Sequence, residues 1–239
     1  DLIIDVQEDD FEGSASIENR GSRYIGPWRG ELVGAFNSAF GLHDRTTLRA
    51  LMTSQSTELR YGELSHEEQI GSEGARIKGR FSLTTTEPGG SISSLGIEGD
   101  SRLFDLEGTY PVLRGRQLNL NLLAGFNLNN TTTDIAGSQI AEDHIRSVRA
   151  GGHLDFTDFM SGVNQIDLTA TRGLRILGPT QDGTGRSRAN GEHEFLRFNA
   201  TVTRLQGLMI PDLSLFLSGT AQSSADPLLA SEEFTVGGG

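Results

Sequence analysis

The sequence predicts an all-β protein, an antiparallel transmembrane β-barrel, on the strength of three observations. Apolar and polar residues alternate in strand-length segments, most clearly from Leu118 to Asn129. The connectors between these segments are short at every second position and mostly long in between, as in barrels with tight turns at one rim and long loops at the other. Only 35% of the residues are hydrophobic and the mean hydropathy is −0.31, which suits strands with a single apolar face.

Eleven barrel strands are expected in chain order. They cover about 13–18, 28–40, 46–53, 61–70, 76–84, 104–110, 118–129, 148–157, 166–171, 196–203 and 213–218. Long connectors are expected at about 87–101, 131–144 and 178–192, where Gly, Ser, Thr and Pro accumulate. A soluble β-sandwich binding module produces the same alternation and stays open as an alternative.

Composition argues against several other functions. The net charge of −12 disfavours nucleic acid as a partner, because phosphate binding needs clustered Lys and Arg. The chain holds no cysteine, and its five histidines are scattered without the spacing of metal ligands. We find no catalytic motif and no phosphate-binding glycine loop, so we expect no enzyme activity, no metal and no cofactor.

Charged residues of both signs occupy the polar positions of the predicted strands. A charge on a lipid-facing position costs a few kcal/mol near the middle of the bilayer, so these residues are expected to face the inside of the barrel. The expected channel-lining residues are Arg76, Lys78, Arg80, Asp105, Glu107, Arg149, Asp155, Asp167 and Arg197.

The alternation also assigns uncharged residues to the two faces. The residues expected to contact lipid are Leu120, Leu122, Leu168, Phe198, Val202, Leu215 and Leu217. Those expected to line the lumen beside the charged residues are Asn121, Thr169, Asn199 and Ser218.

Several short motifs, in order, resemble those of the haemolysin secretion/activation family, the outer-membrane transporters of two-partner secretion. The segment from Ser231 to Gly238 is similar to the S-E-x-F-x-x-G-G stretch that opens the sixth extracellular loop in that family. Residues 16–22, Gly26 and residues 37–44 resemble the family's barrel start, and Tyr110 to Arg114 resembles its Y-P-L-L-R strand end. The family's V-R-G-Y/F motif would follow the last residue of this chain.

This resemblance implies a barrel of about sixteen strands, the size that encloses an aqueous lumen. Residues 1–10 would be the end of the second periplasmic POTRA domain, and residues 11–239 the N-terminal part of the barrel. Glu233, Phe234, Gly237 and Gly238 would then start the sixth extracellular loop. The chain would be an excerpt of a longer protein, unable to close into a pore alone.

The functional expectation that follows is a pore in the outer membrane of a Gram-negative bacterium. It would translocate a secreted exoprotein, of the haemolysin or adhesin type, from periplasm to cell surface, and would contact outer-membrane lipid and lipopolysaccharide. A barrel-assembly protein of the same superfamily is the alternative within this resemblance.

Overall fold

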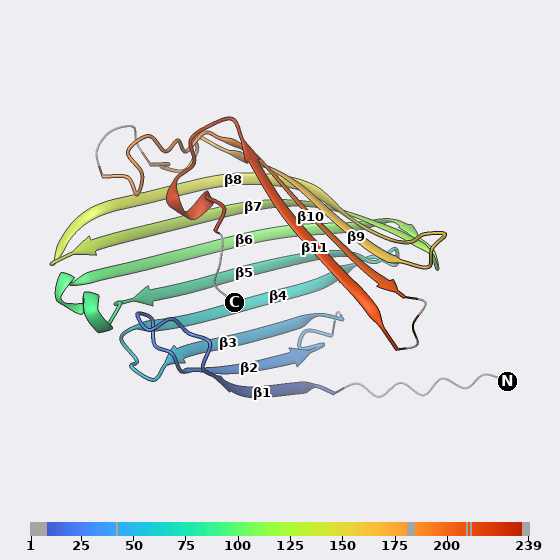
Figure 1. Cartoon of the computed structure of the whole chain (residues 1–239), viewed down its shortest axis with the longest axis horizontal. Coiled ribbons are helices and arrows are strands. Elements are labelled where there is room, and N and C mark those ends of the chain that lie inside the picture. Colours follow the sequence, from blue (N-terminus) through green and yellow to red (C-terminus); the bar gives the residue numbers. More distant parts are fainter. Residues whose placement is uncertain (1–8, 42, 181–184, 209, 211, 236–239) are drawn as a thin grey trace.

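The computed structural model describes residues 9–41, 43–180, 185–208, 210 and 212–235. Eleven strands form one sheet in which each strand pairs antiparallel with its neighbours in the chain (Figure 1). The first six are β1 (Phe11–Glu18), β2 (Arg29–Asn37), β3 (Arg45–Thr53), β4 (Leu59–Ile70), β5 (Ala75–Thr86) and β6 (Ile97–Arg114). The others are β7 (Leu118–Ile135), β8 (Ser138–Thr157), β9 (Val163–Gly173), β10 (Leu196–Gly207) and β11 (Ser214–Ser224).

The strand count and order predicted from alternation are confirmed. A β-sandwich needs a second sheet against the apolar face, and the described residues form a single sheet, so the sandwich alternative is wrong. Two short 3₁₀ helices complete the structure, η1 (Gly90–Leu95) and η2 (Ala230–Glu232). Within the described part of the chain, no helix is long and apolar enough to cross a membrane.

The long connector expected at 131–144 is wrong. Strands β7 and β8 run on as a hairpin of 18 and 20 residues, joined only by Ala136 and Gly137. Both turn residues have positive φ, 51° and 75°, which matches the twist of a two-residue hairpin. The Asn- and Thr-rich composition suggested a loop, but β-branched threonines favour strands when a partner strand is present. The connector before β6 is likewise shorter than expected and ends before Ile97.

The connectors alternate between the two ends of the sheet, and the three longest, 19–28, 87–96 and 174–195, all lie at one end. Tight links occupy the opposite end, at 38–44, 71–74, 115–117, 158–162 and 208–213. The other end carries 19–28, 54–58, 87–96, the β7–β8 hairpin and the loop 174–195. We call these the short-turn end and the long-loop end.

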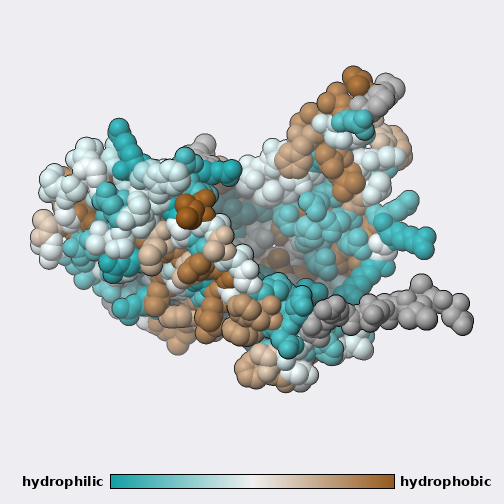
Figure 2. All heavy atoms as spheres, turned by 90° about the horizontal axis from the view of Figure 1, so that it is seen from below, coloured by the Kyte–Doolittle hydropathy of each residue, from teal (hydrophilic) through white to brown (hydrophobic). Residues whose placement is uncertain are grey.

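The sheet curves so that its polar face is concave. Five residues that register places on this face, Ser65, Ser82, Asp105, Ser147 and Thr171, are buried although only one sheet is present. Large apolar side chains on the opposite face stay open: Leu32 is 62% exposed and Leu168 55%. Figure 2 shows the resulting hollow, in which hydrophilic residues gather.

The only cluster of buried apolar side chains in the described structure lies at the long-loop end. Ile145 of β8 and Phe195, just before β10, pack there with Leu228 and Leu229, which follow β11. Apolar packing therefore joins the loop 174–195 to the segment after β11.

The predicted POTRA strand lies in residues 1–8, outside the described residues. Asp9 and Asp10, the last two residues of the same predicted segment, contact β2. The Asn37 side-chain amide donates to the backbone carbonyl of Asp9 at 2.8 Å, and the Asn37 backbone N–H donates to the backbone carbonyl of Asp10 at 3.0 Å.

Candidate channel wall

Strand register brings all nine predicted channel-lining residues onto the concave face. Lys78 and Arg80 of β5 lie opposite Glu107 and Asp105 of β6. From there the same face continues through Gly125 to Arg149 of β8, and through Thr171 to Arg197 of β10. Asp155 and Asp167 lie on it toward the short-turn end, and Arg76 on β5. Their placement together follows from strict alternation across eleven strands in register.

Arg149 is the centre of the densest charge cluster on this face. Its Nη1 and Nη2 donate to Asp105 Oδ2 and Oδ1 at 2.5 and 2.9 Å, a two-pronged geometry that suits a guanidinium group. Nη2 also donates to Glu107 Oε2 at 2.8 Å, and Asn127 donates to Asp105 at 3.3 Å. Arg80 approaches Asp105 from the other side at 3.9 Å. Two arginines thus balance the two acidic side chains.

A glycine makes this contact possible. Gly125 of β7 lies between Glu107 on β6 and Arg149 on β8, and the Arg149 side chain crosses it. A Cβ built on Gly125 would be 3.0 Å from Arg149 Cζ and 3.1 Å from its Nε. A larger side chain at this position would therefore push the guanidinium away from the acids.

His153 forms a second cluster with the two predicted aspartates. Its Nδ1 lies 2.6 Å from Asp167 Oδ1, and its Nε2 lies 3.0 Å from Asp155 Oδ1. Gln165 donates to Asp155 at 3.1 Å. A metal site would need further ligands, and no group of three or more His, Cys, Asp or Glu suited to a metal ion occurs among the described residues.

The first strands of the sheet carry ion pairs that the predicted set omitted. Arg45 of β3 contacts Glu12 of β1 at 2.9 Å, and Arg49 contacts Glu31 of β2 at 2.5 Å. Arg76 pairs with Glu67 of β4 at 3.2 Å. The signal that could have found Glu12, Glu31 and Glu67 was the same alternation, continued into strands where apolar and polar residues mix more freely.

The two faces assigned from alternation are also separated by register. Asn121 aligns with His153, Thr169 with Asn199, and Ser218 with Thr203, all on the concave face. The seven predicted lipid-facing residues lie on the convex face, where Leu122, Leu168, Phe198, Val202, Leu215 and Leu217 are 44–55% exposed. A polar, ion-paired inner face and an apolar outer face can separate water from hydrocarbon.

The predicted start of the loop motif folds back toward the concave face. Glu233 forms an ion pair with Arg188 of the loop 174–195, and Phe234 is 46% exposed. Gly237 and Gly238 lie outside the described residues. The most buried acid of this segment is Glu232, which sequence reasoning had not singled out; it is 8% exposed and paired with Arg197. Burial raises the pKa of the Glu232 carboxyl, and Arg197 opposes this shift.

A single antiparallel sheet of eleven neighbouring strands, concave and charged on one side and apolar on the other, is the wall of a membrane β-barrel. Comparison with known proteins identifies the family. The sequence model of the haemolysin secretion/activation proteins ShlB/FhaC/HecB matches residues 1–239, and the chain belongs to this family.

The solved structures with a similar fold include two CdiB proteins. CdiB from Escherichia coli aligns with a TM-score of 0.82 and 18% sequence identity, covering 94% of this chain and 42% of that one. CdiB from Acinetobacter baumannii aligns with a TM-score of 0.64 and 12% identity, covering 88% and 38%. The chain therefore spans less than half the length of these two structures. No curated protein sequence matches it.

Proposed function

We propose that this chain forms part of the wall of an outer-membrane pore that passes a secreted exoprotein from the periplasm to the cell surface. The observation that carries the proposal is the charged concave face in a member of the haemolysin secretion/activation family. A hydrated wall of paired charges offers polar contacts to a moving polypeptide without an apolar surface on which it would stick. The proposed activity is transport of a polypeptide, in which no covalent bond is made or broken, so the proposal includes neither catalysis nor a cofactor.

The same proposal assigns the surroundings of the pore. The convex face contacts the lipid and lipopolysaccharide of a Gram-negative outer membrane, and the long-loop end faces the cell exterior. Residues 1–10 are the end of the second periplasmic POTRA domain. With a net charge of −12, the chain has no role in nucleic-acid binding.

Secretion is tested in a strain that carries the full-length gene and the gene next to it. Deleting the full-length gene should shift a large exoprotein encoded by the neighbouring gene from the medium to the periplasm, while porin levels stay unchanged. A general loss of porins from the outer membrane would instead identify a barrel-assembly protein.

The nine channel-lining residues are tested by cysteine scanning; residues 1–239 contain no cysteine, and any cysteine elsewhere in the full-length protein is first replaced. In lipid-reconstituted full-length protein, cysteines at Asn121, Thr169 and Ser218 and at the nine charged positions should react with a membrane-impermeant thiol reagent. Cysteines at Leu122, Leu168 and Leu215 should be protected. The reverse pattern would contradict the assignment of the faces.

A further inference from the structure

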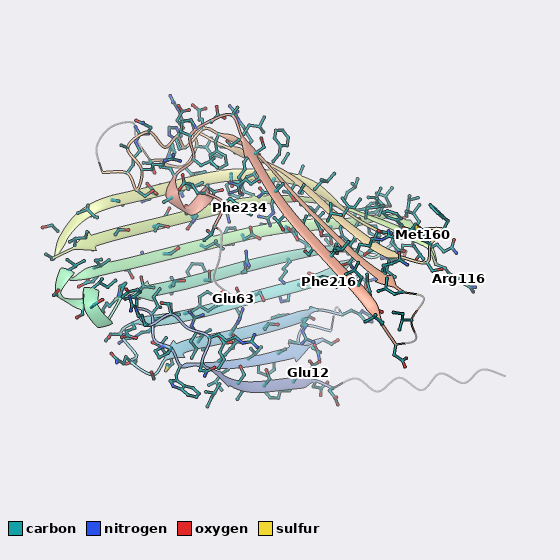
Figure 3. All side chains as sticks on the ribbon, viewed as in Figure 1. Glu12, Glu63, Arg116, Met160, Phe216 and Phe234 are labelled. Carbon is teal, nitrogen blue, oxygen red and sulfur yellow. The ribbon has the colours of Figure 1, made fainter. Side chains whose placement is uncertain are left out.

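The segment after β11, residues 225–235, returns over the concave face (Figure 1). Its contacts show this directly: Arg197 of β10 and Gln222 of β11, both on the concave face, bind Glu232 in η2. In Figure 3, Phe234 projects over the sheet and not beyond its edge. This segment therefore takes up space on the lumen side of the wall.

Arg197 holds one residue of the segment by two different groups. Its Nη1 donates to the backbone carbonyl of Glu232 at 3.0 Å and pairs with the Glu232 carboxylate. Gln222 Nε2 donates to the same carbonyl at 3.0 Å, and Asn199 donates to Gln222 Oε1, also at 3.0 Å. The Arg197 and Glu232 side chains are only 20% and 10% exposed. The ion pair of Arg197 and Glu232 is therefore nearly buried and is surrounded by a network of hydrogen bonds.

Apolar packing completes the attachment. Leu229 is fully buried against the cluster that contains Ile145 and Phe195. The backbone of Glu192 in the loop 174–195 forms a bridge with Leu228 and donates to the carbonyl of Pro227 at 2.8 Å. Burial of the leucines favours docking, but it also carries Glu232 out of water, and a buried carboxylate without a counter-charge opposes docking strongly.

We propose that Arg197 is a positioning residue that holds the segment after β11 on the concave face. Docking of the segment is independent of transport, and only its effect on the pore rests on the proposed function. The neighbouring pair of Arg188 and Glu233 cannot replace Arg197, because its side chains are 50% and 43% exposed and water screens them.

The test measures docking through the solvent access of Leu229. In full-length protein in lipid nanodiscs, a Leu229→Cys reporter should react slowly with a water-soluble maleimide, and an exposed Ser231→Cys reporter should react fast. Adding Arg197→Met should raise the reaction rate of the Leu229 reporter at least tenfold, because Glu232 loses its counter-charge. Glu232→Gln should raise the rate less than Arg197→Met does, because Arg197 still donates to the backbone carbonyl of residue 232 and the neutral amide tolerates burial.

The decisive variant combines both changes. Arg197→Met with Glu232→Gln should react more slowly than Arg197→Met alone, because no unpaired charge is then buried. Arg49→Met, which breaks an Arg–Glu pair on the same face far from the segment, is the matched control and should leave the rate unchanged. Heat-modifiable migration in gels confirms that each barrel is folded.

An unchanged rate in Arg197→Met would overturn the role of Arg197, and so would a double variant that reacts as fast as Arg197→Met. Planar-bilayer conductance of the same variants tests the proposed pore separately, and Arg197→Met should lengthen the open periods of that pore. If labelling changes as expected but the protein secretes no partner, the role of Arg197 stands and the proposed function fails.

Discussion

The guanidinium group of Arg149 on β8 crosses β7 to bind Asp105 on β6, with two nitrogen–oxygen distances of 2.5 and 2.9 Å. The contact joins residues two strands apart, so it ties three strands together from their concave side. It depends on Gly125, the residue of β7 that the guanidinium crosses.

Gly125→Val should therefore destabilise the barrel. The valine would displace Arg149 and leave Asp105, which is 5% exposed, without its main partner. Breaking a buried pair from one side costs about 3 kcal/mol or more. Urea unfolding of the full-length protein in detergent, followed by circular dichroism, measures the loss. Gly62→Val is the control, since a Cβ at Gly62 meets nothing within 4 Å; equal losses in both variants would refute the role of Gly125.

Sequence alone located the nine charged residues on one face but not their pairing. Alternation fixes the side of the sheet to which Arg149 points, whereas its contact with Asp105 requires register across β6, β7 and β8. The contact of Arg197 with Glu232 could not be predicted from the sequence at all. It depends on how the chain turns after β11, and no local pattern encodes that turn. The extension of β7 and β8 into a long hairpin was missed for a similar reason. Its Asn- and Thr-rich segments form strands because they pair with each other, and neither segment shows a strand pattern by itself.

A charge placed on the convex face should cost far more than the same charge on the concave face. Leu168 and Thr169 are neighbours at the centre of β9 and point to opposite faces. Leu168→Arg should lower the free energy of unfolding in lipid by about 2–4 kcal/mol, the cost of an arginine near the midplane. Thr169→Arg should change it by less than about 1 kcal/mol, because the new side chain stays in water. Similar losses from both substitutions would mean that the convex face does not contact lipid.

Docking of the segment after β11 should strengthen as the pH falls. Burial raises the pKa of Glu232 in the docked state, so docking is accompanied by proton uptake at a pH above the ordinary glutamate value of about 4.3. Docking is then most favourable below that value and weakens as the pH rises through the raised pKa. A nitroxide on Ser231→Cys should show a smaller mobile fraction at pH about 5 than at pH about 7. Glu232→Gln should abolish the dependence, and a persistent dependence would assign it to another group.

Residues 1–239 alone should form no defined pore. In the described sheet β1 and β11 are the two edges, and they do not pair with each other. With eleven strands in alternating directions, the two edges run parallel, whereas bacterial barrels formed from one chain close with antiparallel neighbours and an even strand number. Each unpaired N–H or C=O facing hydrocarbon costs several kcal/mol, and the edges would instead drive association between copies.

Planar-bilayer recording of purified residues 1–239 should show only irregular leak currents, with the full-length protein as control. Discrete, reproducible conductance steps from the segment would show that eleven strands can close, alone or by pairing between copies.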